Sequence, residues 1–350
     1  MFGITTSYAT GLPALDARED FGSARRSRLT AQVGHCITGG LSRERRPRWL
    51  LAPAALAAGT ARLEVVTLDS IVARFRPASN RVRQRWERIA LTVSATVQGE
   101  LWSSDPRGWA EAAEGRIRPL YERVLERLHL LPGTRLLDAG CGSGLFAELA
   151  AQGGADVMGL DVAPGLVEYA RRRRPAAGYV VEDLERMPFG DGAFEVVAAF
   201  NSVLYAADPR RALAEIARVT APSGRAVVTV GAGPEQAESA ALIDPLAPHD
   251  EVPDRSTFDL ADADAARGAL LDAGFASVAM ADVAFDVDFE SEDNAVAAQL
   301  PAGPVVAAVR HSGRAAVEAA LRSFFAPRSR ADGTVRMGVV FRCYLAERAL

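Results

Sequence analysis

The sequence contains no lysine, few cysteines and histidines, and no long uninterrupted apolar run. All 40 basic residues are arginine, which excludes the phosphate-binding loops whose motif ends in lysine followed by serine or threonine. Three cysteines in 350 residues cannot form a disulfide framework, and this usage is typical of a reducing, cytoplasmic compartment. The four histidines lie far apart and no Cys-x-x-Cys pair occurs, so we expect no metal site.

The composition, with 49% hydrophobic and 24% charged residues, is that of a globular chain of one large domain or two modest ones. Its most apolar stretch, residues 49–58, contains Pro53 and has arginines on both sides. It is also shorter than the roughly 18–20 apolar residues that a membrane span needs. We therefore expect no membrane-spanning segment and no membrane partner.

The formal net charge of −4 hides two regions of opposite charge. Residues 1–92 carry 15 arginines against 7 acidic residues, whereas residues 93–350 carry 25 against 37. No sustained helical or strand periodicity runs through residues 1–62. We interpret residues 1–92 as an arginine-rich extension that is poorly ordered or that results from a start codon assigned too far upstream. The alternative is that its arginine cluster at 74–88 contacts nucleic acid.

From residue 109 onward, apolar runs typical of strands alternate with helical periodicity. The strands are expected at residues 134–138, 156–161, 179–182, 194–200 and 225–230. The helices are expected at 109–131, 144–152, 165–173 and 210–220. Such alternation predicts an α/β fold with a mainly parallel sheet and helices on both faces, which binds its ligand at the carboxyl edge of the strands.

A glycine-rich turn follows the first expected strand, which ends at Asp138. Gly140, Gly142 and Gly144 permit positive φ angles and leave backbone N–H groups accessible to a ligand. A dinucleotide-binding fingerprint would need its third glycine at position 145, where Leu145 stands. The spacing therefore disfavours a nicotinamide dinucleotide.

The segment 138–144 resembles motif I of the class I S-adenosylmethionine-dependent methyltransferases, and Asp161 closes the next strand as in that family. Segments 181–197 and 219–225 are similar to two further family motifs in the same order, although Glu182 and Ser223 stand where the family usually has glycine. The resemblance implies a Rossmann-like seven-stranded sheet whose last strand is antiparallel. It also implies a methyltransferase domain over 93–350, with a core at 134–230 and lid segments at 231–258 and 290–327.

The resemblance further implies a set of residues that bind S-adenosylmethionine. They are Asp138, Gly140, Cys141, Gly142, Gly144, Asp161, Val162, Asp183, Leu184 and Asn201. In this reading Asp138 and the backbone near Gly140 hold the methionyl end, and Asp161 accepts hydrogen bonds from the ribose hydroxyls. Val162, Asp183 and Leu184 lie near the adenine, and Asn201 lies near the sulfonium.

The expected reaction is in-line transfer of a methyl group to a small-molecule acceptor by a monomer or homodimer. Nucleic acid is not expected as the acceptor, because residues 93–350 carry a net negative charge. His249 is the best candidate for a general base, although a loop histidine that only faces solvent is the simpler reading. Cys141 is expected to present its backbone rather than act as a nucleophile.

Three aromatic residues of the first helical region, Trp102, Trp109 and Tyr121, could close over the cofactor or simply dock that region on the sheet. Two other functions remain open at this stage. One is a nicotinamide-dependent oxidoreductase. The other is a non-catalytic regulator that binds S-adenosylmethionine or a nucleotide and uses its basic extension to contact nucleic acid.

Overall fold

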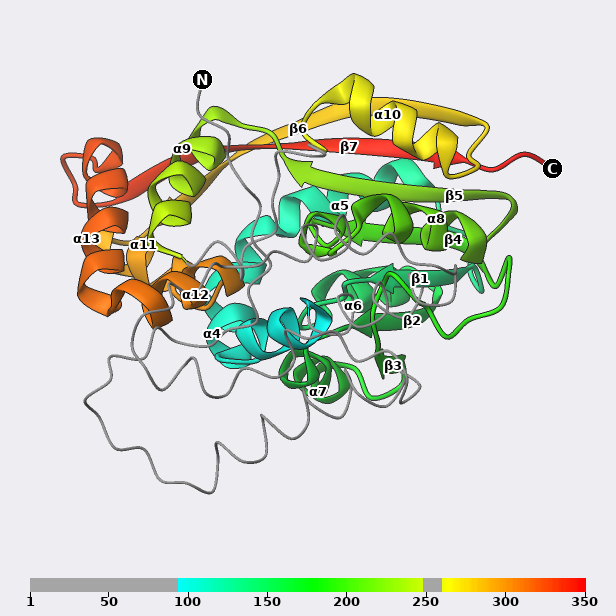
Figure 1. Cartoon of the computed structure of the whole chain (residues 1–350), viewed down its shortest axis with the longest axis horizontal. Coiled ribbons are helices and arrows are strands. Elements are labelled where there is room, and N and C mark those ends of the chain that lie inside the picture. Colours follow the sequence, from blue (N-terminus) through cyan, green and yellow to red (C-terminus); the bar gives the residue numbers. More distant parts are fainter. Residues whose placement is uncertain (1–93, 248–259) are drawn as a thin grey trace, which may run out of the picture. The chain divides into compact units, whose positions relative to one another are not determined.

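The structure is a computed structural model that describes residues 94–247 and 260–350 (Figure 1). The described residues form one seven-stranded sheet of order β3-β2-β1-β4-β5-β7-β6. The strands are β1 (Arg135–Ala139), β2 (Asp156–Asp161), β3 (Gly178–Val181), β4 (Phe194–Phe200), β5 (Thr220–Gly231), β6 (Ser277–Phe289) and β7 (Val335–Glu347). The pairs among β1 to β5 are parallel, and β7 is antiparallel to both β5 and β6. The predicted Rossmann-like sheet is confirmed.

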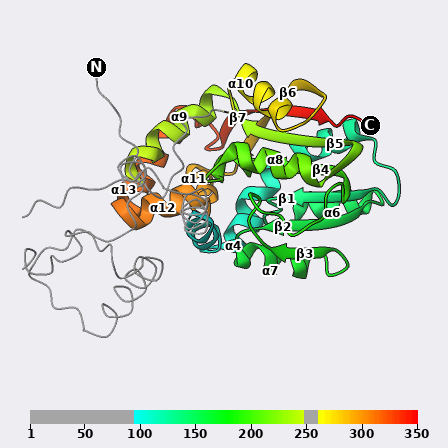
Figure 2. The same cartoon turned by 45° about the vertical axis from the view of Figure 1, so that its right-hand side comes forward.

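Helices cover both faces of this sheet (Figure 2). One face packs against α5 (Arg118–Leu128), α6 (Leu145–Gln152) and α7 (Pro164–Arg173), and the other packs against α8 (Pro209–Val219) and α10 (Ala263–Asp272). Strand β1 shows why two layers form, because successive side chains of a strand point to opposite faces. Leu136 lies in the hydrophobic cluster on the face covered by α5, α6 and α7. Leu137 lies in the cluster on the face covered by α8 and α10, and both side chains are fully buried.

A helical insertion separates β6 from β7, as the sequence predicted. It consists of α11 (Glu292–Gln299), α12 (Gly303–Ser312), α13 (Arg314–Phe325) and the short turn η7 (Ala326–Arg328). It packs against α9 (Pro234–Ile243) and η6 (Asp244–Leu246), which follow β5. The described parts of the two expected lid segments therefore lie against each other. Trp102 also reaches this insertion, since a Cβ atom on Gly303 would lie 2.6 Å from its Nε1.

The single helix predicted over residues 109–131 is wrong. The chain instead forms α4 (Pro106–Gly108), a π turn η3 (Trp109–Ala113), a 3-10 turn η4 (Glu114–Ile117) and only then α5. Pro119 explains the break, because it has no N–H to donate to a carbonyl of the preceding turn. Helix α5 also ends before the predicted residue 131. Its last residue is Leu128, and His129 follows in a left-handed conformation.

Strand β5 begins at Thr220 rather than at the predicted residue 225. Its pairing with β4 shifts between Phe194 and Val196, so the intervening residues of β5 form an irregular bend. Ser223 lies in this bend with a φ of +56°. This is the position where the resembling family has glycine, and a serine there accepts some backbone strain.

The arginine-rich extension 1–92, with its cluster at 74–88, and His249 lie outside the described residues. Within the described ranges, no helix is both long enough and apolar enough to cross a membrane. Cys141 and Cys343 are buried free thiols.

Candidate functional site

The glycine-rich loop lies at the carboxyl edge of β1. Gly140, Gly142 and Gly144 have φ angles of +87°, +53° and +85°, which side chains other than glycine rarely adopt. A Cβ atom on Gly140 would also lie 2.2 Å from the Cβ of Ser202, so the loop and the segment after β4 are in close contact. The N–H groups of Gly140 and Cys141 both donate to the carbonyl of Leu160, at 2.7 and 2.9 Å. The loop is therefore fixed against β2.

Asp161 ends β2 and braces the same loop. Its Oδ2 accepts a hydrogen bond from the N–H of Gly142 and its Oδ1 accepts one from the N–H of Ala163, both at 2.9 Å. Each carboxylate oxygen can accept a second hydrogen bond, so a diol could still bind to Asp161. Burial raises the pKa of this carboxyl group, which the two backbone N–H groups counteract.

Five buried side-chain atoms near this edge have no hydrogen-bond partner, and we call them the edge atoms. They are Trp109 Nε1, Asp138 Oδ2, Tyr179 Oη, Asn201 Oδ1 and Thr229 Oγ1. Each unsatisfied buried atom of this kind costs about 1–3 kcal/mol. Proteins keep such atoms mainly where a ligand or a bound water pairs with them.

Several contacts place the edge atoms around the glycine-rich loop and the ends of the neighbouring strands. A Cβ atom on Gly144 would lie 3.2 Å from Tyr179 Oη. Asn201 follows β4 directly, has a φ of +51°, and donates its backbone N–H to the carbonyl of Thr229 on β5. Asp138 is only 1% exposed. Burial, followed by the charges of Glu114 and Asp161, raises its pKa well above the usual value.

A cleft of about 490 Å³ continues from the end of β2. Its lining includes Val162, Glu182 and Asp183 from the sheet edge and Gly99 and Ser103 from the helical segment at 94–102. Two residues expected near the adenine, at 162 and 183, thus line one cleft. Leu184 follows them and packs against the hydrophobic cluster on the α8 face.

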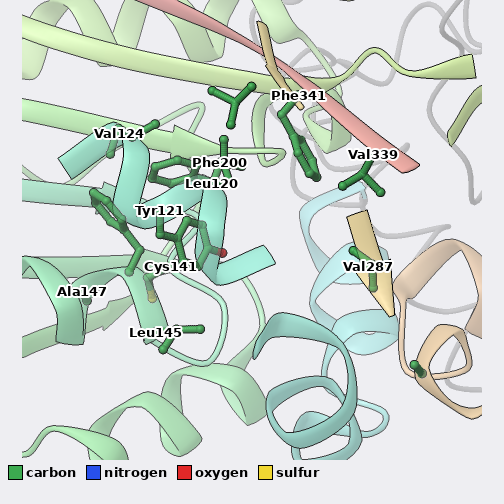
Figure 3. Packing of buried hydrophobic residues seen from close by; sticks show 14 of the residues in the cluster. Leu120, Tyr121, Val124, Cys141, Leu145, Ala147, Phe200, Val287, Val339 and Phe341 are labelled. Atoms are coloured by element: carbon green, nitrogen blue, oxygen red, sulfur yellow. The ribbon is translucent and has the colours of Figure 1, made fainter. Parts of the chain in front are cut away.

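Cys141 is buried inside the loop. Burial raises the pKa of its thiol well above the usual value, which disfavours a nucleophilic thiolate. Tyr121 packs edge-on against Phe146, with ring centroids 5.6 Å apart. It also packs edge-on against Phe200, with ring centroids 4.7 Å apart (Figure 3). Its role in docking α5 on the sheet is therefore evident. Trp109, by contrast, faces the glycine-rich loop.

Three residues of the site were missed by the sequence reasoning. Glu114, Ser143 and Arg173 form a buried polar cluster beside the loop, in which Arg173 Nη1 donates to Glu114 Oε2 at 2.7 Å. The Ser143 hydroxyl donates to the same carboxylate oxygen. Nothing in the sequence pattern distinguishes Glu114 from the other polar positions of an expected amphipathic helix. Its inward position follows from the irregular turn before α5.

Comparisons with known proteins agree with this geometry. A family model described as a methyltransferase domain matches residues 137–228. A malonyl-[acyl-carrier protein] O-methyltransferase of Serratia marcescens is 39% identical over 117 residues, which are 33% of this chain and 46% of that protein. A demethylmenaquinone methyltransferase of Renibacterium salmoninarum is 35% identical over 114 residues, which are 33% of this chain and 48% of that protein. The solved structure of the YcgJ protein from Bacillus subtilis is 17% identical, has a TM-score of 0.46, and covers 66% of this chain and 98% of its own.

The chain spans about half the length of the two relatives that it matches. The matched segment, however, contains the glycine-rich loop together with Asp138, Asp161, Asp183 and Asn201, in the order typical of the family. Residues 137–228 therefore form a class I S-adenosylmethionine-dependent methyltransferase domain.

Proposed function

We propose that this chain transfers a methyl group from S-adenosylmethionine to a small-molecule acceptor. The observation that carries the proposal is the glycine-rich loop, which is braced by Asp161 and surrounded by buried polar atoms that have no partner. A loop of bare backbone beside carboxylates suits a ligand that carries hydroxyl groups and positive charge. The sulfonium compound carries both.

The residues present fit this cofactor. Asp161 would hold the ribose hydroxyls with the lone pairs that Gly142 and Ala163 leave free. Val162 and Asp183 would meet the adenine in the cleft that they line. Asp138 would lie toward the methionyl end, which needs acceptors for its ammonium group. When bound, the cofactor supplies a methyl group on a cationic sulfur, which is a good leaving group.

The contribution of the protein is to position two substrates and to exclude water. Asn201 is held by its backbone contact to Thr229, with an unpaired amide oxygen at the end of β4. It would fix the approach of the acceptor beside the methyl group. The insertion α11–α13 and the segment 231–247 would cover the acceptor, and an acceptor with a hydroxyl or acidic carbon would also need a general base.

The two relatives named above differ in their methyl acceptors. By their names, the two relatives methylate a malonyl group on a carrier protein and demethylmenaquinone. Two relatives with such different acceptors give no reason to choose one of them for this chain. The acidic charge of residues 93–350 favours an acceptor that is not nucleic acid.

The proposal is tested by incubating the full chain with isotopically labelled S-adenosylmethionine and a metabolite extract. We expect S-adenosylhomocysteine to form and one or more metabolites to gain the mass of a labelled methyl group. Parallel calorimetry should show binding of S-adenosylhomocysteine and none of NADH. Binding of NADH alone would favour an oxidoreductase. Cofactor binding without any methylated product, together with DNA binding lost on removal of residues 1–92, would favour a regulator.

A further inference from the structure

The irregular turn before α5 brings two polar side chains onto the glycine-rich loop. A Cβ atom on Gly142 would lie 3.2 Å from Glu114 Oε1 and 3.4 Å from Trp109 Nε1. Glu114 is 2% exposed, and Trp109 Nε1 is one of the unpaired edge atoms. A hydrogen-bond acceptor and a hydrogen-bond donor therefore approach the same backbone position.

The π turn explains how residues 109 and 114 come to the same side. The N–H of Glu114 donates to the carbonyl of Trp109, five residues back rather than four. This wider turn places the two residues one above the other, whereas a regular α-helix would rotate them apart. Single π turns of this kind often occur at functional sites. The break in the helix thus serves to orient this pair.

The carboxylate of Glu114 is held firmly in place. Arg173 donates to its Oε2 at 2.7 Å, and the hydroxyl of Ser143 donates to the same atom. Arg173 also lies 3.8 Å from Glu148. Its single positive charge is therefore shared between two carboxylates. Burial raises the pKa of Glu114, and the hydrogen bonds from Ser143 and Arg173 counteract this effect.

A second buried carboxyl group lies close by. Asp138 is buried, has an unpaired Oδ2, and interacts electrostatically with both Glu114 and Asp161. Like charges in a buried site repel one another, and a cation brought among them relieves that repulsion. The charge of the loop surroundings therefore favours a ligand with a positive group near Gly142.

We propose that Glu114 binds the α-ammonium group of the methionyl part of S-adenosylmethionine and that Trp109 donates its indole N–H to the carboxylate of the same part. The amino-acid end of the cofactor is a zwitterion, so it requires an acceptor and a donor side by side. Glu114 and Trp109, which both approach Gly142, meet this requirement. The inference rests on the proposed function and deepens it.

The test compares three ligands by calorimetry on the full chain. The first is S-adenosylhomocysteine, the second is its analogue without the α-amino group, and the third is 5′-methylthioadenosine, which lacks the whole amino-acid end. The variants are Glu114→Gln and Trp109→Phe. Glu111→Gln is the matched control, because Glu111 lies on the same turn, has a side chain that is 53% exposed, and pairs with Arg107.

We expect Glu114→Gln to weaken the binding of S-adenosylhomocysteine by about tenfold, since it removes a charge-assisted hydrogen bond. The binding of the other two ligands should stay within about twofold of wild type. Trp109→Phe should weaken the binding of both carboxylate-bearing ligands by about fivefold and leave 5′-methylthioadenosine unchanged. Glu111→Gln should leave all three affinities unchanged.

Equal loss for all three ligands in a variant would overturn the inference, because the side chain would then act only through the shape of the loop. Unchanged affinity for S-adenosylhomocysteine in both variants would overturn it as well. If Glu114→Gln does not fold by circular dichroism, Trp109→Phe still decides the matter through its ligand pattern. Wild-type protein that binds 5′-methylthioadenosine as tightly as S-adenosylhomocysteine would contradict the inference and leave the proposed function intact. A wild type that binds none of the three would overturn both.

Discussion

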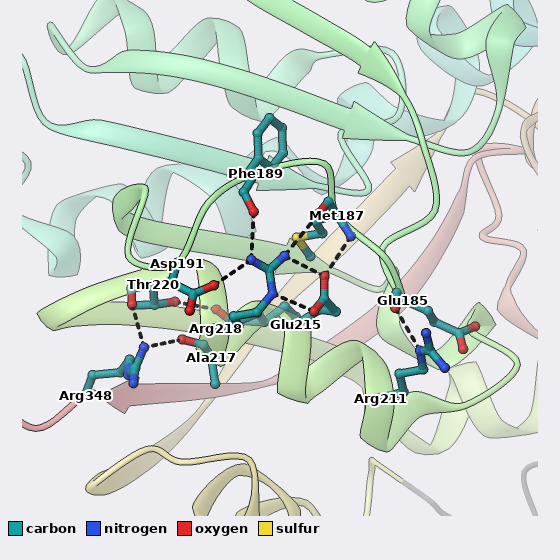
Figure 4. A network of polar contacts seen from close by, with 11 residues as sticks. Glu185, Met187, Phe189, Asp191, Arg211, Glu215, Ala217, Arg218, Thr220 and Arg348 are labelled. Atoms are coloured by element: carbon teal, nitrogen blue, oxygen red, sulfur yellow. Dashed lines mark hydrogen bonds and ion pairs between the residues drawn. The ribbon is translucent and has the colours of Figure 1, made fainter. Parts of the chain in front are cut away.

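Two polar regions of this domain differ in how completely their groups are paired. Near the end of α8, Arg218 donates to both carboxylate oxygens of Glu215, to Asp191, and to the carbonyls of Met187 and Phe189, at distances of 2.7 to 3.1 Å (Figure 4). At the carboxyl edge of the sheet, by contrast, the five edge atoms have no partner. The first region is complete in itself, whereas the second leaves buried donors and acceptors without partners.

The difference indicates which polar groups serve the fold and which serve a ligand. The Arg218 network fastens the loop before β4 to α8, so its bonds contribute to the stability of the domain. The edge atoms have the opposite effect, because a buried polar atom without a partner destabilises the folded state. Changes in the first region should therefore lower stability, and changes in the second should lower ligand affinity.

The largest effect is expected for Arg218→Met. It leaves Glu215 with the N–H of Met187 as its remaining donor and removes the donor of two carbonyls, so we expect the free energy of unfolding to fall by about 3 kcal/mol. Urea denaturation measures this loss. The exposed pair of Arg107 and Glu111 offers a control, because Arg107→Met should leave the free energy of unfolding almost unchanged. Similar losses in the two variants would show that the Arg218 network has no special role.

Asp161→Asn should have the next largest effect, and it should act on binding. The amide keeps the size of the side chain but loses its charge, and it can accept on only one atom where Asp161 accepts on two. We expect calorimetry to show about a tenfold weaker affinity for S-adenosylhomocysteine. An unchanged affinity would remove Asp161 from the site.

Asp138→Asn should affect stability and ligand binding in opposite directions. The carboxyl group is buried with an unpaired oxygen, so the neutral amide should leave stability unchanged or raise it by up to about 1 kcal/mol. Ligand affinity should fall several-fold. A loss of stability with unchanged affinity would place Asp138 among the structural groups.

The pH dependence of stability gives Asp138 a second test. Its pKa is raised in the folded state, mainly by burial and then by Glu114 and Asp161. The folded state therefore holds the proton more tightly than the unfolded state. The stabilisation that comes from this proton is fully present below the unfolded pKa and is lost as the pH rises through the raised pKa of the folded state. The stability of the Asn variant relative to wild type should accordingly increase with pH. Parallel curves for the two proteins would contradict this assignment.

The smallest effect is expected for Cys141→Ala. The raised pKa of the buried thiol disfavours a nucleophilic role, so methyl transfer should remain within about twofold of wild type. The loss of a small buried side chain should lower the free energy of unfolding by about 1 kcal/mol. A near-complete loss of activity with intact cofactor binding would instead point to covalent catalysis by the thiol.

Sequence reasoning succeeded where local pattern and tertiary structure agree. Strands β2 and β4 were predicted with their observed limits, because each apolar run ends at a polar residue. The glycine-rich loop was also placed correctly, because its positive φ angles leave few alternatives to glycine. The hydrogen bond from the N–H of Gly142 to Asp161, by contrast, was not predicted.

The failures have a physical cause as well. Helical periodicity continues through residues 109–117, and only Pro119 hints that the hydrogen bonding changes there. Periodicity reports which residues are apolar, but it does not report whether a turn closes after four residues or five. The positions of Glu114 and Trp109 depend on that difference, so neither could be assigned to the loop from sequence.

We infer that the edge atoms and the glycine-rich loop together bind S-adenosylmethionine. A crystal structure of the full chain with S-adenosylhomocysteine tests it most directly. We predict that the ribose hydroxyls lie within hydrogen-bond distance of Asp161, and that Asp138 Oδ2 and Asn201 Oδ1 pair with the ligand or with water that it holds. A ligand bound elsewhere, with these atoms still unpaired, would contradict the account.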